Sequence, residues 1–400
     1  MNKIRIIILI VMYVAISCAM LFSVGCGLFD QDTDKPRKVD ATPSDPDASV
    51  STSAVLSFIA EHSTGKFSAV ISGQNCGHGS QIADPANMMS YESIIGDLAA
   101  QTGKYPGMIG VDYEHDRIFT QEQLSACNAV LIDYWNKGGL VTVNWAPHNP
   151  WLNNESDIIN NYGVWTDTRN KDDNMKNVNL DDLVDPSKPV YAVWRTKLDR
   201  IADALSELQS AGVVVLWRPL QEMNGDWFWW GIATTGGRGA QYRQIYADMF
   251  EYFTETKGLH NLLWVFSPCA TGGYESSSIR FCDDFYPGDA YVDVVAGTCY
   301  NDDLFIADYD RYLRFGKPVG MAELGASIGS DIAKNGSFDN RRYASIIRSD
   351  YPAVAYWVSW HNWDNGDGTY TWMSLNKNKY AKECLGSGKI ITRDEIPSFK

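Results

Sequence analysis

A glutamate among aromatic residues, at 217–231, is the segment of this chain best suited to chemistry. It reads W-R-P-L-Q-E-M-N-G-D-W-F-W-W-G and contains Glu222. The apolar, β-branched run 212–217 before it is typical of a strand buried on both faces. Glu222 therefore follows the end of a predicted parallel strand. In closed parallel α/β folds, catalytic side chains gather at that end.

Four aromatic residues at 227–230 accompany this glutamate. Exposed indole rings beside a carboxylate suit a sugar, because the apolar C–H face of a pyranose packs on an aromatic ring. The competing interpretation is a Trp-rich core segment with a surface glutamate. We favour the exposed rings, since four consecutive aromatic side chains cannot all face one core from a regular strand or helix.

Cleavage of a glycosidic bond requires a second carboxyl group in a different protonation state. The segment 316–325 supplies Glu323 at the end of a short apolar run. The separation, 323 − 222 = 101 residues, corresponds to about three βα units of about 31 residues each in a barrel. Glu323 alone could be a surface cap of the next segment. The spacing favours a pair on strands four and seven.

Short apolar runs alternate with helical segments such as 192–210 and 242–256. This alternation predicts an α/β fold, a (β/α)8 TIM barrel that forms a single catalytic domain over 53–400. A doubly wound open sheet is the alternative, but residues 73–77 lack the dinucleotide-binding glycine pattern. The expected strands are 68–72, 107–111, 140–144, 213–217, 262–266, 292–296, 319–322 and 353–359.

Further candidate binding residues lie just past other predicted strands. Taken singly, each could be a structural residue or part of a binding site. Their convergence on one rim favours the site, and the long polar connection 147–191 is expected to shape a cleft. They are Trp145, His148 and Asn149 after the third strand, Tyr300 after the sixth, and Trp360 after the eighth.

The first 25 residues are expected to be a signal peptide, since Lys3 and Arg5 precede an apolar stretch. Its length would also permit a membrane span. The sequence Ser23-Val24-Gly25-Cys26 resembles a bacterial lipoprotein processing site, and Cys18 is a weaker candidate. We expect lipid on Cys26, a flexible linker over 26–52, and a protein held outside the cytoplasm at the cell envelope or secreted.

The chain carries a formal net charge of −15, which becomes −17 without residues 1–25 because two cations and no acids are lost. Such acidity argues against nucleic acid or anionic lipid as a partner and suits a neutral polymer. We expect a monomer that meets membranes only through its lipid. Six cysteines follow Cys26 and allow 15 pairings, which the sequence leaves open. Their spacing does not predict a zinc site, no metal-ligand cluster is evident, and no cofactor is implied.

From about Ser51 to the C-terminus the chain resembles glycoside hydrolase family 26, the β-mannanase family. The resemblance rests on residues 217–231, on Glu323-Leu324-Gly325, on Gly110-Val111-Asp112 and on Asn149-Pro150. It implies β-mannan as substrate and the following roles: Glu222 as acid/base, Glu323 as nucleophile, Tyr300 as the residue that positions the nucleophile, and Trp227 and Trp360 as sugar-stacking walls.

Two positions depart from the family pattern. Gln221 stands where the family usually has His before the acid/base, and Trp145-Ala146 stands where it usually has Trp-His. An amide donates and accepts hydrogen bonds, but it does not titrate as imidazole does. The alternatives are therefore a mixed-linkage β-glucanase or β-1,3-xylanase on the same scaffold, or a non-catalytic surface glycan-binding lipoprotein.

The expected reaction is retaining hydrolysis by double displacement, in which Glu323 attacks and Glu222 donates a proton. Burial among the aromatic residues should raise the pKa of Glu222. Hydrogen-bond donors such as Tyr300 and Arg218 should keep Glu323 charged.

Overall fold

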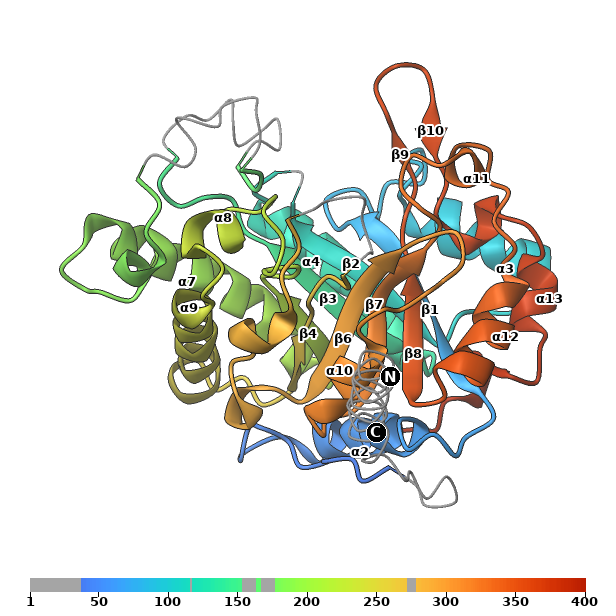
Figure 1. Cartoon of the computed structure of the whole chain (residues 1–400), viewed down its shortest axis with the longest axis horizontal. Coiled ribbons are helices and arrows are strands. Elements are labelled where there is room, and N and C mark those ends of the chain that lie inside the picture. Colours follow the sequence, from blue (N-terminus) through green and yellow to red (C-terminus); the bar gives the residue numbers. More distant parts are fainter. Residues whose placement is uncertain (1–36, 116, 153–162, 167–176, 272–277) are drawn as a thin grey trace, which may run out of the picture. The chain divides into compact units, whose positions relative to one another are not determined.

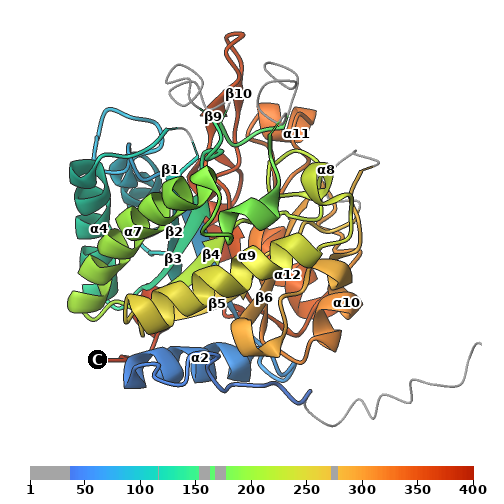
Figure 2. The same ribbon diagram turned by 90° about the vertical axis from the view of Figure 1, so that its left-hand side faces the viewer.

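The computed structural model describes residues 37–115, 117–152, 163–166, 177–271 and 278–400 (Figure 1). Within it, Arg37–Lys400 forms one compact unit. A parallel sheet lies at the centre and helices surround it, as both views show (Figures 1 and 2).

Eight parallel strands close into a barrel, which confirms the predicted (β/α)8 architecture. Each strand pairs with the next in the sequence, and β8 pairs with β1 from Ile71↔Tyr356 to Gln74↔Ser359. The barrel strands are β1 Val70–His78, β2 Met108–Glu114, β3 Leu140–Ala146, β4 Val215–Pro219, β5 Leu262–Phe266, β6 Val294–Tyr300, β7 Val319–Gly325 and β8 Val354–Ser359.

All eight strands overlap their predicted positions, but six of them, β1, β2, β3, β4, β6 and β7, run further than predicted at the carboxyl end. The extensions of β1, β2, β6 and β7 include His78, Asp112, Tyr300 and Glu323. An apolar run stops at its first polar residue, whereas the hydrogen-bonded ladder continues into the barrel mouth. Polar residues at these strand ends are consequently buried, and the barrel wall fixes their positions.

The principal helices of the outer layer are α4 Gln121–Asn136, α7 Pro189–Ser210, α9 Ala240–Glu251, α10 Tyr309–Arg314 and α12 Arg341–Asp350 (Figure 2). The predicted helix 192–210 is confirmed, and it begins three residues earlier because Pro189 occupies the first turn. The predicted helix 242–256 is α9 followed by a π-helical turn, Tyr252–Thr256. Thr120 and Gln123 form a capping box that starts α4.

The described fold has further helices and strands. The helix α2 lies across one end of the barrel, away from the β9–β10 hairpin, in both views (Figures 1 and 2). The strand β11 pairs in parallel with the start of β1. These elements are α2 Val50–His62, α3 Asp97–Thr102, α8 Ile232–Thr235, α11 Asp331–Lys334, α13 Ala381–Leu385, β9 Trp363–Asp364, β10 Tyr370–Thr371 and β11 Ile390–Ile391.

The expected linker 26–52 is too long at its C-terminal end, because residues 37–49 are bonded to the barrel domain. The Arg37 guanidinium donates to the carbonyls of Leu313 at 3.0 Å and Lys317 at 2.8 Å. The backbone N–H of Ser44 donates to the Asp293 carboxylate at 2.6 Å. Polar side chains here satisfy polar groups of the barrel, so a low apolar content did not mean a solvated segment. Residues 26–36, with Cys26, lie outside the described residues.

The six cysteines of the described chain are all buried free thiols: Cys76, Cys127, Cys269, Cys282, Cys299 and Cys384. The pairings that the sequence left open are thus not formed among these residues. No helix in the described part of the chain is long and apolar enough to cross a membrane.

Replacement of Asp293 by Ala should destabilise the fold. The buried Asp293 carboxylate accepts the backbone N–H groups of Ser44 and Trp264, at 2.6 and 2.7 Å, and alanine leaves both donors without their acceptor. We expect a loss of about 2–3 kcal/mol in the free energy of unfolding, measured by denaturant titration. Asp47→Ala, at an exposed position of the same segment, is the control. Equal stability of both variants would show that residues 37–49 are not anchored through Asp293.

Candidate active site

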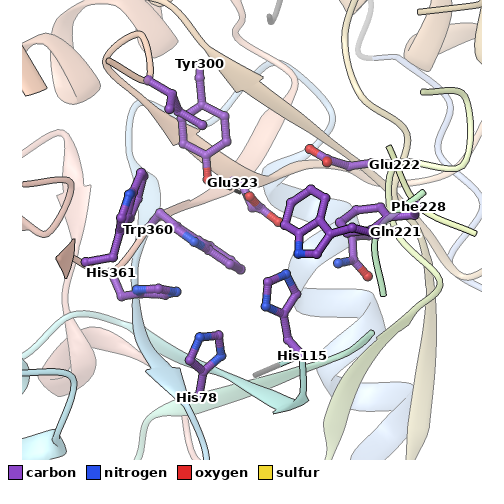
Figure 3. A pocket seen from close by; sticks show the side chains of 12 residues that line it. His78, His115, Gln221, Glu222, Phe228, Tyr300, Glu323, Trp360 and His361 are labelled. Atoms are coloured by element: carbon purple, nitrogen blue, oxygen red, sulfur yellow. Dashed lines mark hydrogen bonds between the residues drawn. The ribbon is translucent and has the colours of Figure 1, made fainter. Parts of the chain in front are cut away.

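A cavity of about 380 Å³ opens at the carboxyl ends of the barrel strands (Figure 3). Side chains from β1, β6 and β7, and from the segments just past β2, β4 and β8, line it. Its lining residues are His78, His115, Trp165, Gln221, Glu222, Phe228, Tyr300, Glu323, Ile328, Trp360, His361 and Trp363. Glu222 and Glu323 therefore share one pocket, as the sequence spacing indicated.

The chain leaves β4 through an uncommon backbone conformation that aims Glu222 into the pocket. Leu220 and Glu222 have φ values of 52° and 55°, in the left-handed region that non-glycine residues rarely adopt. The N–H of Glu222 donates to the Ser267 carbonyl at 2.8 Å, which ties this turn to the segment after β5. Such strain at a pocket residue is typical of functional sites.

Glu222 receives two side-chain hydrogen bonds within the barrel mouth. The Trp227 indole N–H donates to Oε2 at 2.8 Å, and the Thr298 hydroxyl donates to Oε1. Burial, and next the negative charge of Glu323, raise the pKa of Glu222 to about 7, whereas the two donors oppose this rise. Glu222 can consequently hold a proton near neutral pH.

Glu323 lies in a different electrostatic environment from Glu222. The Arg218 guanidinium donates to Glu323 Oε1 at 2.7 Å, and the Tyr300 hydroxyl donates to Oε2. Both the arginine and the glutamate are buried. A buried cation together with a hydroxyl donor stabilises an ionised carboxylate. The pocket thus holds one carboxyl group suited to carry a proton and one suited to remain an anion.

The four aromatic residues 227–230 are not an exposed platform, which corrects that expectation. Trp229 and Trp230 are fully buried, and their indole N–H groups donate to the carbonyls of Pro147 and Gln221 at 2.7 and 2.8 Å. Only Phe228 among the four lines the pocket. Trp227 does not line it, but its indole N–H donates to Glu222, which does. The segment is an irregular turn, so successive rings point in different directions and three of the four reach the core.

Other aromatic rings form the walls of the pocket. Trp165, from the long connection 147–191, packs on Phe228 with ring centroids 4.9 Å apart. Trp360 lines the pocket after β8, with the Arg218 guanidinium 5.6 Å from its ring centroid. The structure therefore places Trp360, Tyr300 and Gln221 around the carboxyl pair. Of the described residues of 147–191, only Trp165 lines the pocket.

The candidate binding residue Trp145 is wrong as a pocket residue. It is fully buried behind the barrel strands, where it stacks on Trp194 and Trp217 with centroids 5.5 and 6.1 Å apart. Its indole N–H donates to Glu114 at 3.1 Å. Side chains alternate between the two faces of β3, and that of Trp145 points outward toward α7. Because a strand buried on both faces is apolar throughout, its sequence does not show which side chains point outward.

His148 and Asn149 are also absent from the pocket lining. Both are buried at the turn after β3, where the Asn149 N–H donates to the Gly163 carbonyl at 2.7 Å. The Asn149 side chain accepts the N–H of Trp151 at 2.9 Å. These two contacts of Asn149 hold the turn, and neither residue lies where the predicted contact with sugar would require it.

Sequence reasoning missed three histidines that line the pocket: His78, His115 and His361 (Figure 3). Each lies at or just past a strand end, so the rule that found Tyr300 and Trp360 applies to them as well. Burial lowers the pKa of His115 to about 3 and that of His361 to about 4, and it lowers the pKa of His78 well below its usual value. All three rings are therefore neutral at pH 7.

Asp112, near the end of β2, lies beside these histidines. It is fully buried, and burial raises its pKa to about 8. Asn144 donates to Asp112 Oδ1 at 3.0 Å. With His78 and His361 it forms a group of metal-ligand type, which the sequence did not suggest because the residues come from three separate strand ends.

Comparison with known proteins agrees with this geometry. The profile of glycosyl hydrolase family 26 matches residues 44–395. A "Mannan endo-1,4-beta-mannosidase A and B" of Caldalkalibacillus mannanilyticus is 32% identical over 365 residues, which cover 89% of this chain and 63% of that protein. A "Mannan endo-1,4-beta-mannosidase" of Bacillus subtilis is 33% identical over 357 residues, 87% of this chain and 89% of that protein.

The fold has solved counterparts too. The structure of Bacillus subtilis mannanase man26 superposes with a TM-score of 0.71 and 28% sequence identity, and the match covers 89% of this chain and 96% of that one. The family profile spans the whole barrel. The two carboxyl groups that the family resemblance implies, Glu222 and Glu323, lie in one pocket. The chain belongs to glycosyl hydrolase family 26.

Proposed function

We propose that this protein is a retaining endo-β-1,4-mannanase that hydrolyses the backbone of mannan-type polysaccharides. The observation that carries the proposal is the pair of buried carboxyl groups in one pocket, Glu222 and Glu323. Burial and the neighbouring Glu323 charge favour the protonated form of Glu222, whereas Arg218 pairs with Glu323. The two mannan endo-1,4-β-mannosidases that are 32% and 33% identical support the choice of substrate. No step of this chemistry requires a cofactor.

The reaction proceeds in two displacements at the anomeric carbon. Glu323, paired with Arg218, attacks that carbon while Glu222 gives its proton to the departing glycosidic oxygen. Glu222, now a carboxylate, then takes a proton from water, and the water oxygen displaces Glu323 from the glycosyl-enzyme. Two inversions give net retention. Tyr300 holds the second oxygen of Glu323 and so fixes the direction of attack.

Aromatic walls and a free amide oxygen suit the sugar that occupies this pocket. Trp360, Trp165 and Phe228 offer ring surfaces for the apolar faces of pyranoses. Gln221 Oε1 is buried without a hydrogen-bond partner among the described residues. A sugar hydroxyl next to the carboxyl pair would satisfy it. Gln221 thus replaces the expected histidine as a hydrogen-bonding group without adding a titrating one.

Hydrolysis of a panel of pure polysaccharides tests the proposal directly. Mannan, mixed-linkage β-glucan and β-1,3-xylan are digested in parallel, and products are separated by chromatography. We expect a ladder of manno-oligosaccharides from mannan, and an initial β-anomer in proton NMR. A larger specific activity on β-glucan or β-1,3-xylan would assign the substrate to the alternatives, and binding of mannan without product would leave a glycan-binding protein.

Replacement of Glu323 by Ala should abolish turnover, because no other group replaces the attacking carboxylate. We expect kcat on mannan to fall by at least about 10³-fold. Circular dichroism should show an intact barrel. Glu383→Ala, at an exposed site on α13, is the matched control and should keep full activity. If the Glu323 variant retained most of its activity in a folded state, Glu323 would not be the nucleophile.

The alkaline limb of the pH profile should report Glu222. The acid must be protonated, so kcat/KM should decline as pH rises through about 7, the pKa of Glu222. Trp227→Phe removes the indole donor that stabilises the Glu222 carboxylate, so the limb should move to higher pH. Trp372→Phe, a partly exposed tryptophan outside the pocket, is the control. An alkaline limb that stayed in place in Trp227→Phe would assign it to another group.

We also propose that Cys26 is lipidated and that the mature protein is tethered outside the cytoplasm. The support is the apolar segment ending in Ser23-Val24-Gly25-Cys26, because lipid carried on a cysteine anchors a polypeptide without a membrane-spanning helix. The polar residues up to Pro36 would then separate the lipid from the barrel.

Expression of the full chain in a bacterium fed radiolabelled palmitate tests the anchor. The wild type should incorporate label and sediment with membranes, and Cys26→Ser should lose both properties. Cys18→Ser is the control and should remain labelled. Label retained by Cys26→Ser would overturn the assignment of Cys26, and a soluble, unlabelled wild type would overturn the anchor itself.

A further inference from the structure

Three side chains at the pocket floor have no role in the double displacement. His78 at the end of β1, Asp112 near the end of β2 and His361 just past β8 each offer a ligand atom, and these atoms lie within 4.8 Å of one another. All three residues are buried. Two of them, His78 and His361, also line the pocket beside the catalytic glutamates (Figure 3).

The distance between His78 and Asp112 shows that these two buried groups do not bond to each other. Their Nδ1 and Oδ2 atoms are 3.6 Å apart, which is too long for a hydrogen bond. Neither atom has a hydrogen-bond partner in the described part of the chain. Two buried polar atoms that face each other unsatisfied are unusual, and each such atom calls for an explanation.

A shared cation accounts for this spacing. Nitrogen and oxygen ligands about 2.0–2.2 Å from a tetrahedral ion lie roughly 3.3–3.6 Å from one another. The 3.6 Å between His78 Nδ1 and Asp112 Oδ2 matches this value. The ligand atom of His361 lies within 4.8 Å of the other two, and binding of the ion would draw it closer.

Neighbouring contacts orient two of these groups as ligands. His361 Nδ1 lies 2.9 Å from the Asn362 carbonyl, and because a carbonyl only accepts, Nδ1 carries the proton. The lone pair of His361 is then on Nε2. Asn144 donates to Asp112 Oδ1 at 3.0 Å, which leaves Oδ2 for a metal. Such outer contacts are characteristic of imidazole and carboxylate ligands in metal sites.

The surrounding charge is compatible with a bound cation. Arg218 is the positive group that acts most strongly on Asp112. Its guanidinium is already paired with Glu323 at 2.7 Å, so much of its charge is compensated. Burial favours the protonated form of Asp112, and a bound cation would replace that proton and stabilise the carboxylate as a ligand.

We propose that His78, Asp112 and His361 bind a divalent transition-metal ion, Zn²⁺ in the first instance, at the floor of the sugar pocket. Two imidazoles and one carboxylate are a ligand set that zinc sites use, and three protein ligands leave one position open. Because His78 and His361 line the cavity, that position faces the sugar. Water or a substrate hydroxyl would fill it. The site goes beyond the proposed hydrolysis, which does not require a metal.

Equilibrium binding of Zn²⁺ to the EDTA-treated mature protein tests this site. The protein is dialysed free of chelator and titrated with Zn²⁺ by calorimetry, and bound metal is counted after gel filtration by mass spectrometry. We expect one Zn²⁺ per chain and an increase in the melting temperature. Co²⁺ serves as an optical probe, because its absorption bands distinguish four-coordinate from six-coordinate geometry.

Variants of the ligands locate the ion. His78→Gln, Asp112→Asn and His361→Gln should each weaken Zn²⁺ binding more than about 100-fold, beyond the range expected for loss of an outer contact. His148→Gln alters another buried histidine, outside the pocket, and should still bind one equivalent. Circular dichroism identifies any variant that fails to fold, and three independent ligands keep the test decisive.

Two outcomes overturn the proposal. The first is a wild-type protein that binds no Zn²⁺, in which case His78 and Asp112 are left to bond with substrate hydroxyls directly. The second is stoichiometric binding that persists in folded His78→Gln and Asp112→Asn. Mannan hydrolysis, assayed in EDTA on the same samples, is a separate readout. Activity without metal binding would remove the site alone, and metal binding without hydrolysis would remove the proposed reaction alone.

Discussion

One buried guanidinium, that of Arg218, determines how the acidic groups of this pocket are charged. Asp112, Glu222 and Glu323 are all buried near it, and its 2.7 Å hydrogen bond is to Glu323. A buried ion pair is costly to break, about 3–5 kcal/mol when one partner is removed. A second buried anion beside Glu323 has no cation of its own. Glu222 therefore keeps its proton to higher pH, and the pocket acquires an acid and a nucleophile from the same residue type.

The barrel makes this charge arrangement possible by bringing distant residues together. Thr298 on β6 is the register partner of Glu323 on β7, and its hydroxyl donates to Glu222 from the β4 end. A register shift between Gly297 and Thr298 displaces the ladder at this point. The left-handed residues Leu220 and Glu222 turn the chain in at the opposite side. A ladder irregularity and an uncommon backbone conformation thus occur where two strand ends must aim side chains at one glycosidic bond.

The sequence was informative wherever a pattern has one physical solution. Eight buried apolar runs alternating with helices allow few folds, and Glu222 and Glu323, three βα units apart, must then face one mouth. It was less informative where direction depends on alternation within a strand buried on both faces. Trp145 in β3 and Tyr300 in β6 both lie just past the apolar run of their strand, yet Trp145 points outward to α7 while Tyr300 points into the pocket. Both strands read as continuous apolar runs, so only the ladder register separates the two cases.

The sequence also did not show which of the aromatic residues 227–230 are buried. The indole N–H groups of Trp229 and Trp230 find carbonyl acceptors in the interior, which makes burial of these rings favourable. The histidines of the pocket were not predicted either. Gln221 occupies the place where the family resemblance implies His, while β1, β2 and β8 supply His78, His115 and His361 around the same cavity. Imidazole rings are thus still present in the pocket. The sugar would meet an amide next to the acid together with neutral imidazoles, so its contacts there differ from those that the family pattern implies.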